Sequence, residues 1–153
     1  MSWYELLLFL HILAMATWFG SGLAILVLAA RALPAGGAAF GTFAINAGWW
    51  AGRAHPAAGV ILLLTGFGML AEGDIDFGQT WVVLGLVGLV AAFAVGGALI
   101  GRTSEALSKS LQAAGGTMTD EHRPLAQKIL LYSRIELVVL VLVIADMVAK
   151  PGA

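Results

Sequence analysis

The chain has 153 residues, of which 60% are hydrophobic and only 11% are charged, and its mean hydropathy is +0.94. Soluble domains are about half apolar and roughly a quarter charged, so this composition excludes water as the main solvent. The net charge of −1 gives no basic surface for a nucleic-acid partner. Because the chain has no cysteine, disulfides, thiolate metal ligands and thiol nucleophiles are excluded together.

A single domain of four membrane-spanning helices accounts for the whole length, 1–153. The fold class is therefore an all-α integral membrane four-helix bundle, with the lipid bilayer as its main partner. The apolar runs predict spans at about 3–30, 53–71, 80–100 and 128–149.

The first span begins with Trp3, which suits the membrane interface, and a break follows at Pro34. From Ala38 to Trp50 a weaker helical pattern predicts a segment that lies at the interface before the second span starts. Pro56 is expected near the start of that span, where the lost backbone hydrogen bond costs least.

An acidic, glycine-containing segment at 72–78 predicts a tight external loop. The third span is rich in glycine, and its helix is expected to continue past Arg102 into water until Gly115 and Gly116 stop it. The fourth span ends just before Pro151.

The positions of lysine and arginine predict the orientation. Lys150 is the only basic residue on its side of the membrane, so the positive-inside rule puts both termini outside the cell and the opposite end in the cytoplasm. The expected location is a cell membrane, which the chain crosses several times. The seven basic residues on the other side are Arg31, Arg53, Arg102, Lys109, Arg123, Lys128 and Arg134.

Small residues recur every fourth position in two of the spans. Lipid gives no hydrophobic drive between helices, so close contact at small residues supplies much of the packing. Such a stripe is also compatible with a seam between two copies of the chain, and a homo-oligomer is left open. The two stripes are Ala16, Gly20 and Ala24, and Gly88, Ala92 and Gly96.

Ionisable residues inside a span are costly, which makes each of them a functional candidate. His11 lies about 12 Å below the external surface at the helical rise per residue. Met15, Trp18 and Gly22 fall on the same helical stripe and can face one groove with it. The alternative role of His11 is a hydrogen bond to a neighbouring helix.

The last span contributes a second polar set. Glu136 and Asp146 share one stripe, about 21 Å and 6 Å from the external surface. At the cytoplasmic end Glu136 can meet His55, Arg53 and Arg134. The alternatives are that His55 is simply solvated at the interface and that Arg134 and Glu136 form a structural or snorkelling pair.

His11 and His55 cannot be the two axial ligands of one haem. Their nitrogens would have to be about 4 Å apart, whereas the residues differ in depth by about 15 Å. A haem held by His11 alone, or with Met15, Met69 or a residue of a second chain, is compatible with the sequence. A copper site would need clustered methionine and histidine, and the methionines are scattered along the chain.

The runs Phe9-Leu10-His11-Ile12-Leu13 and Thr17-Trp18-Phe19-Gly20-Ser21-Gly22 resemble the first helix of a bacterial group of membrane proteins. The group contains CopD-type copper-resistance proteins, HemJ-type protoporphyrinogen oxidases and a family of predicted integral membrane proteins of unknown function, which the chain resembles most. Further matching runs are Leu64-Thr65-Gly66, Trp81-Val82-Val83-Leu84-Gly85 and Ala149-Lys150-Pro151-Gly152.

The resemblance implies that His11 matches the first-helix histidine with which the HemJ type is thought to bind haem. Where that type has a Trp-Leu-His-x-Lys run, this chain has Val83 and Gly85 in place of the histidine and lysine. We therefore interpret the chain as a non-enzymatic or accessory membrane protein whose bundle binds haem b or another small ligand at His11, with Met15 and Trp18 beside it. A HemJ-type redox enzyme and a CopD-like copper component are the two alternatives.

Overall fold

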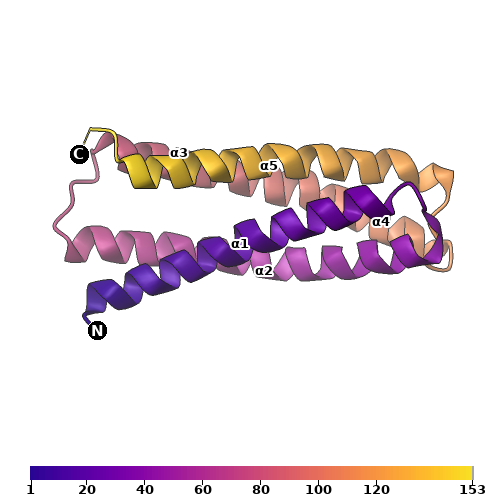
Figure 1. The fold of residues 1–153 in the computed structure, drawn as a ribbon, viewed down its shortest axis with the longest axis horizontal. Coiled ribbons are helices and arrows are strands. Elements are labelled where there is room, and N and C mark those ends of the chain that lie inside the picture. The colour runs from indigo at the N-terminus through magenta and orange to yellow at the C-terminus, as the bar shows by residue number, and fades with distance from the viewer. Residues whose placement is uncertain (153) are drawn as a thin grey trace.

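Four long helical rods run along one axis in the computed structural model of the protein, which describes residues 1–152 (Figure 1). The third rod is continuous but changes its winding, from α-helix to π-helix and back. The all-α fold class predicted from the sequence is confirmed. The elements are α1 (Trp3–Ala32), α2 (Gly37–Glu72), α3 (Thr80–Phe93), the π-helix η1 (Ala94–Gly101), α4 (Arg102–Ala113), the 3-10 turn η2 (Asp120–His122) and α5 (Arg123–Ala149).

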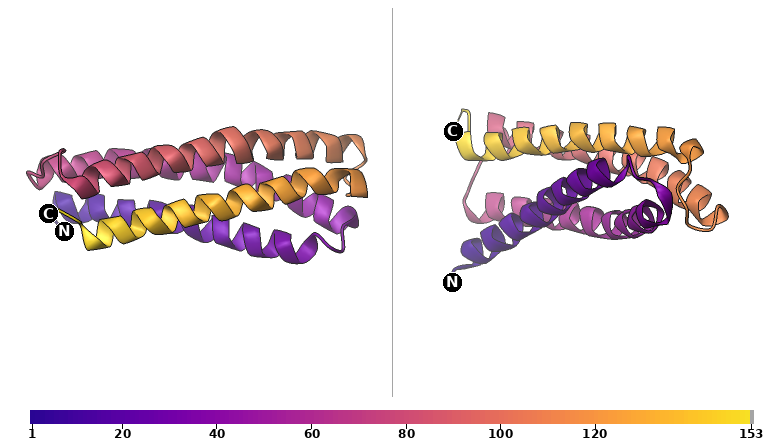
Figure 2. Two further views of the ribbon diagram at one scale, coloured as in Figure 1. Left: turned by 90° about the horizontal axis from the view of Figure 1, so that it is seen from above. Right: turned by 45° about the vertical axis from the view of Figure 1, so that its right-hand side comes forward.

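The rods are arranged as two pairs. α1 packs mainly on α2, and α3 packs mainly on α5, with α1 running obliquely across the bundle (Figures 1 and 2). Both chain termini lie at one end, which we call the terminus end. The connections 33–36 and 114–119 lie at the other, which we call the loop end.

Local chemistry sets the helix ends. Ser2 and Glu5 form a capping box at the start of α1: the Glu5 N–H donates to the Ser2 hydroxyl at 3.2 Å, and the Ser2 N–H donates to the Glu5 carboxylate at 2.7 Å. α4 stops at Gly115 and Gly116, whose φ angles of +67° and +79° suit glycine. The predicted continuation of the third helix to these glycines is confirmed.

The loop end has a core of its own. The rod from Thr80 to Ala113 has 34 residues, or about 51 Å at the helical rise, against about 30 Å of hydrocarbon in a bilayer. Part of it therefore projects into water, where the hydrophobic effect can stabilise packing. The buried residues of this end are Leu33, Phe40, Leu107, Leu111, Met118 and Ala126.

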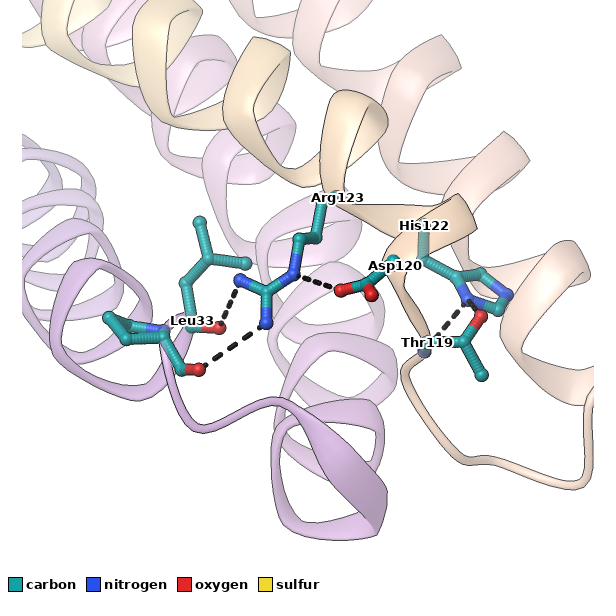
Figure 3. Close-up of polar contacts among 6 residues, drawn as sticks. Leu33, Thr119, Asp120, His122 and Arg123 are labelled. Atoms are coloured by element: carbon teal, nitrogen blue, oxygen red, sulfur yellow. Dashed lines mark hydrogen bonds and ion pairs between the residues drawn. The ribbon is translucent and has the colours of Figure 1, made fainter.

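Backbone contacts close the loop end. Gly37 and Met118 exchange two backbone hydrogen bonds, of 3.2 and 3.0 Å. A Cβ on Gly41 would run into the carbonyl oxygen of Gly116, so glycine allows α2 to approach this loop. The Arg123 guanidinium donates to the carbonyl oxygens of Leu33 and Pro34, at 3.3 and 3.4 Å (Figure 3). These bonds join the start of α5 to the turn after α1.

The 3-10 turn η2 is held by hydrogen bonds between residues that are three positions apart. The Thr119 N–H donates to Nδ1 of His122 at 3.1 Å (Figure 3). Asp120 accepts a hydrogen bond from Nε of Arg123 at 2.7 Å. Both contacts fix the entry to α5, which begins at Arg123, five residues before the expected start of the fourth span.

The second helix differs from the sequence expectation. α2 runs without a break from Gly37 to Glu72, so residues 38–50 belong to the same helix as the span and are not a separate interfacial segment. Pro56 consequently lies in the helix interior, not near the start. Helices in membranes tolerate such a proline because neighbouring groups compensate for the lost hydrogen bond.

One of the two small-residue stripes is an interface within the chain. A Cβ on Gly88 would collide with Val143 of α5, and one on Gly96 with the Glu136 carboxylate, while Ala92 between them is completely buried. The stripe on α1 is exposed instead, and a Cβ on Gly20 would meet nothing within 4 Å. Small residues therefore bring α3 and η1 against α5.

Candidate functional site

His11 makes the interhelical hydrogen bond that the sequence analysis gives as its alternative role. Its Nδ1 lies 2.9 Å from the Thr65 hydroxyl oxygen on α2. The single hydroxyl proton of Thr65 is donated to the Ile61 carbonyl at 2.6 Å, so Nδ1 of His11 must carry the proton of the shared bond. Nε2 is then unprotonated and is the nitrogen left for a ligand.

His11 lines a cavity of about 500 Å³ at the terminus end, the terminus-end cavity. Its wall is mostly aliphatic and aromatic. Three of the five methionines of the chain, Met15, Met69 and Met147, lie on this wall although they are distant in sequence. Lys150 also borders the cavity, with its Nζ 5.2 Å from the centre of the Trp81 ring.

Trp18 lies on the predicted stripe with His11 but does not line the same cavity. It is 1% exposed and belongs to the central core of the bundle. Its ring packs on Phe93 and stacks on His55, at centroid distances of 5.3 and 6.1 Å. Because α1 crosses the bundle obliquely, the same helical face meets different neighbours at different depths. The sequence analysis predicts that Trp18 shares a groove with His11, but Trp18 does not line the cavity that contains His11.

A second cavity, of about 570 Å³, extends from Trp18 toward the loop end, and we call it the loop-end cavity. Glu136 of α5 lies at its inner end and is only 3% exposed. The indole Nε1–H of Trp18 donates to Oε1 of Glu136 at 3.3 Å. Gly96 stands opposite this carboxylate, within η1. π-helical turns are frequently found at functional sites.

His55 lines the same cavity in the middle of α2, half-buried rather than solvated at the membrane interface. Its Nε2 lies 3.0 Å from the Ser21 hydroxyl oxygen. That hydroxyl donates its proton to the Thr17 carbonyl at 2.6 Å, so Nε2 of His55 carries the proton of the shared bond. His55 and Thr65 are ten residues apart on α2, which keeps His55 about 15 Å from the His11 level.

The two arginines expected beside Glu136 do not join it. Arg53 is exposed and lies over the Trp49 ring, 4.4 Å from its centre. Arg134 is exposed as well. In the part of the chain that the structure describes, the ion pairs are Lys109–Glu105 and Arg123–Asp120. The predicted pairing of Arg134 with Glu136 is therefore not present.

Asp146 lies nearer the terminus end, between α5 and α3. A Cβ on Gly85 would be 3.6 Å from its Oδ2. Both carboxylate oxygens are enclosed, and neither has a hydrogen-bond partner among residues 1–152. Asp146 lines neither of the two cavities, so it stands apart from His11 and from Glu136.

Sequence reasoning did not find the groups that fix the histidines or complete the cavities. Thr65 and Ser21 read as ordinary polar residues of apolar helices, and both donate to the backbone four residues earlier. Only an oblique helix crossing brings them against histidines of another helix. Met147 carries no pattern of its own, because methionine is common in apolar segments, whereas Met69 is named in the sequence analysis as a possible haem ligand.

Three rods, α1, α2 and the one from Thr80 to Ala113, are long and apolar enough to cross a membrane. α5 has the length but carries Arg134, Glu136 and Asp146. With its glycine-mediated packing and its buried ionisable groups, this is a helical integral membrane protein of four helices.

The protein belongs to the family of predicted integral membrane proteins DUF2269, whose model matches residues 5–151. Neither a curated protein nor a solved structure matches the chain. Membership of this family places the protein in a lipid bilayer.

Proposed function

We propose that the protein binds a haem-like ligand in the terminus-end cavity, where His11 would hold its iron. The observation that carries the proposal is the hydrogen bond from Nδ1 of His11 to Thr65. Metal-binding histidines generally donate their other ring N–H to a neighbouring group, which fixes the tautomer and the ring orientation. Nε2 of His11 has the lone pair that an iron ligand requires.

The rest of the cavity wall fits an amphiphilic macrocycle. Apolar and aromatic residues such as Phe19 and Phe67 suit a porphyrin ring, and Met15 or Met69 would offer the iron a thioether. Lys150 and Tyr4 border the same cavity and suit the carboxylate groups of haem. A bound haem would supply a redox-active iron, and the protein would supply binding and orientation.

A second candidate is a Cu(I) site in the same cavity, in line with the CopD-type alternative. Thioether and imidazole groups are donors that Cu(I) accepts. The observation in its favour is that Met15, Met69 and Met147 share one cavity wall with His11. The alternative of a HemJ-type oxidase has no comparable support. At the positions of the histidine and lysine of that type, Val83 is 46% exposed and Gly85 brings no side chain to the cavity.

Titration of the purified protein with haem and, separately, with Cu(I) tests these candidates. With haem, we expect the wild-type protein to show a Soret band. His11→Ala should abolish this band, whereas His55→Ala should leave it intact, since His55 lies at another depth. A protein that stays colourless on haem titration contradicts it. Saturable Cu(I) binding without haem binding would favour the copper site.

The proposed orientation has both termini outside the cytoplasm, in a bacterial inner membrane. It is supported by the basic residues of the loop end, with Lys150 alone near the other end. The chain contains no cysteine, so single cysteines can be introduced without background. Asp74→Cys should react with a membrane-impermeant reagent in intact cells, whereas Ser110→Cys should react only after permeabilisation. The reverse pattern would invert the orientation.

A further inference from the structure

The loop-end cavity is lined by two acidic residues. Its described wall contains no lysine or arginine, whereas Glu136 of α5 is 3% exposed and Glu105 lies on α4. Glu105 is already paired with Lys109 at 2.6 Å. Glu136 is left as the carboxylate without a compensating cation.

The buried position of Glu136 requires compensation. Its one hydrogen bond, from the Trp18 indole, is long at 3.3 Å, and a neutral donor does not cancel a charge. An ionised carboxylate without a partner inside a bilayer is strongly disfavoured. The site therefore needs either a proton on Glu136 or a cation beside it.

The shape and walls of the cavity favour an organic cation over a metal ion. The described residues include no group of three histidine or carboxylate side chains that could hold a metal. Aromatic side chains line the cavity instead, including Trp18, Phe93 and Phe40, and aromatic rings attract cations. Gly22 and Gly97 leave space between the helices, and the volume of about 570 Å³ is in the range of small-molecule sites.

We propose that the loop-end cavity binds a lipophilic organic cation, of the quaternary ammonium or phosphonium class, with Glu136 as its counter-charge and Trp18 and Phe93 as aromatic wall residues. The cation takes the place of a proton on Glu136, so that cation and proton compete for one carboxylate. This site is separate from the His11 cavity and does not depend on the haem proposal.

The competition fixes the direction of the pH dependence. Glu136 faces Trp18 of α1 and Gly96 of η1, neither of which titrates, and shares the cavity with His55 of α2 and Glu105 of α4. As the pH falls, protonation of Glu136 removes the counter-charge and protonation of His55 adds a repelling charge. Both changes weaken cation binding in acid.

The test is equilibrium dialysis of tetraphenylphosphonium against the full-length protein in nanodiscs of zwitterionic lipid. The wild-type protein is expected to bind it saturably, and Glu136→Gln to lower the affinity by about tenfold or more. Asp146→Asn is the matched control, because it removes one carboxylate from the same helix outside the cavity, and its affinity should equal that of the wild type. Lack of saturable wild-type binding, or equal affinity in Glu136→Gln, would overturn the proposal.

A pH series on the wild-type protein keeps the test decisive if Glu136→Gln does not fold. The affinity for tetraphenylphosphonium should fall as the pH is lowered, and each bound cation should release protons into a weakly buffered solution. His55→Gln should retain the pH dependence, because Glu136 remains. An affinity that does not change with pH would contradict competition between proton and cation.

Discussion

The two cavities lie toward opposite ends of one bundle and differ in charge and in wall chemistry. The terminus-end cavity has a lysine, three methionines and a histidine whose Nε2 is free, and none of its described wall residues is acidic. The loop-end cavity has two carboxylates and several aromatic rings, without lysine or arginine in its described wall. The two proposed ligands, an anionic amphiphile and a cation, would thus occupy separate sites, because a packed layer around Trp18 lies between the cavities.

The largest effect is expected from Trp18→Ala, which removes the centre of that layer. Truncation of a buried tryptophan typically costs about 3–5 kcal/mol, and here Glu136 also loses its hydrogen-bond donor. Thermal unfolding in detergent should show a large loss of stability. Trp49→Ala is the control, since Trp49 is 58% exposed. Equal losses in the two variants would mean that the Trp18 layer does not hold the bundle together.

Gly88→Leu tests the helix contact behind the terminus-end cavity. The new side chain would collide with Val143, which lines that cavity, and overpacking of this kind costs about 1–3 kcal/mol. We expect a lower unfolding temperature and weaker haem binding, with tetraphenylphosphonium binding less affected. Val90→Leu, at an outward-facing position of the same helix, should be neutral. A neutral Gly88→Leu would contradict the close contact of α3 with α5.

Thr65→Val tests whether the hydrogen bond between Thr65 and His11 supports haem binding. It removes the acceptor for Nδ1 of His11 with little change of volume, and loss of such a supporting bond typically lowers metal affinity about 10- to 100-fold. The haem titration should show this loss. Ser21→Ala makes the equivalent change at His55 and should leave haem affinity unchanged. An equal change of haem affinity in the two variants would contradict the proposal that His11, and not His55, holds the haem.

The smallest effect is expected from Lys150→Gln, at the border of the terminus-end cavity. An exposed charge contributes about 0.5 kcal/mol, or roughly a two- to threefold change in haem affinity, and added salt should diminish the difference. Lys109→Gln at the loop end is the control for a general effect of lost positive charge. A large loss that salt does not change would indicate a direct structural role for Lys150.

The sequence by itself determined the membrane character, the four helices and the main packing stripe. Long apolar runs in a chain of 11% charged residues allow few other folds, and helical periodicity suffices to put Gly88 and Gly96 on one face. It also singled out His11 and Glu136, because ionisable groups are conspicuous in apolar segments. These are local properties, which spacing along one helix can express.

Only the tertiary structure decided which residues meet. Crossing angles separate Trp18 from His11, bring Met69 and Met147 to His11, and turn Arg53 and Arg134 outward from Glu136. The π-helical stretch of η1 and the unbroken passage of α2 through Pro56 are likewise seen only in the tertiary structure. Sequence spacing fixes the face of a helix on which a residue lies, but the neighbour of that face changes with depth when helices cross obliquely.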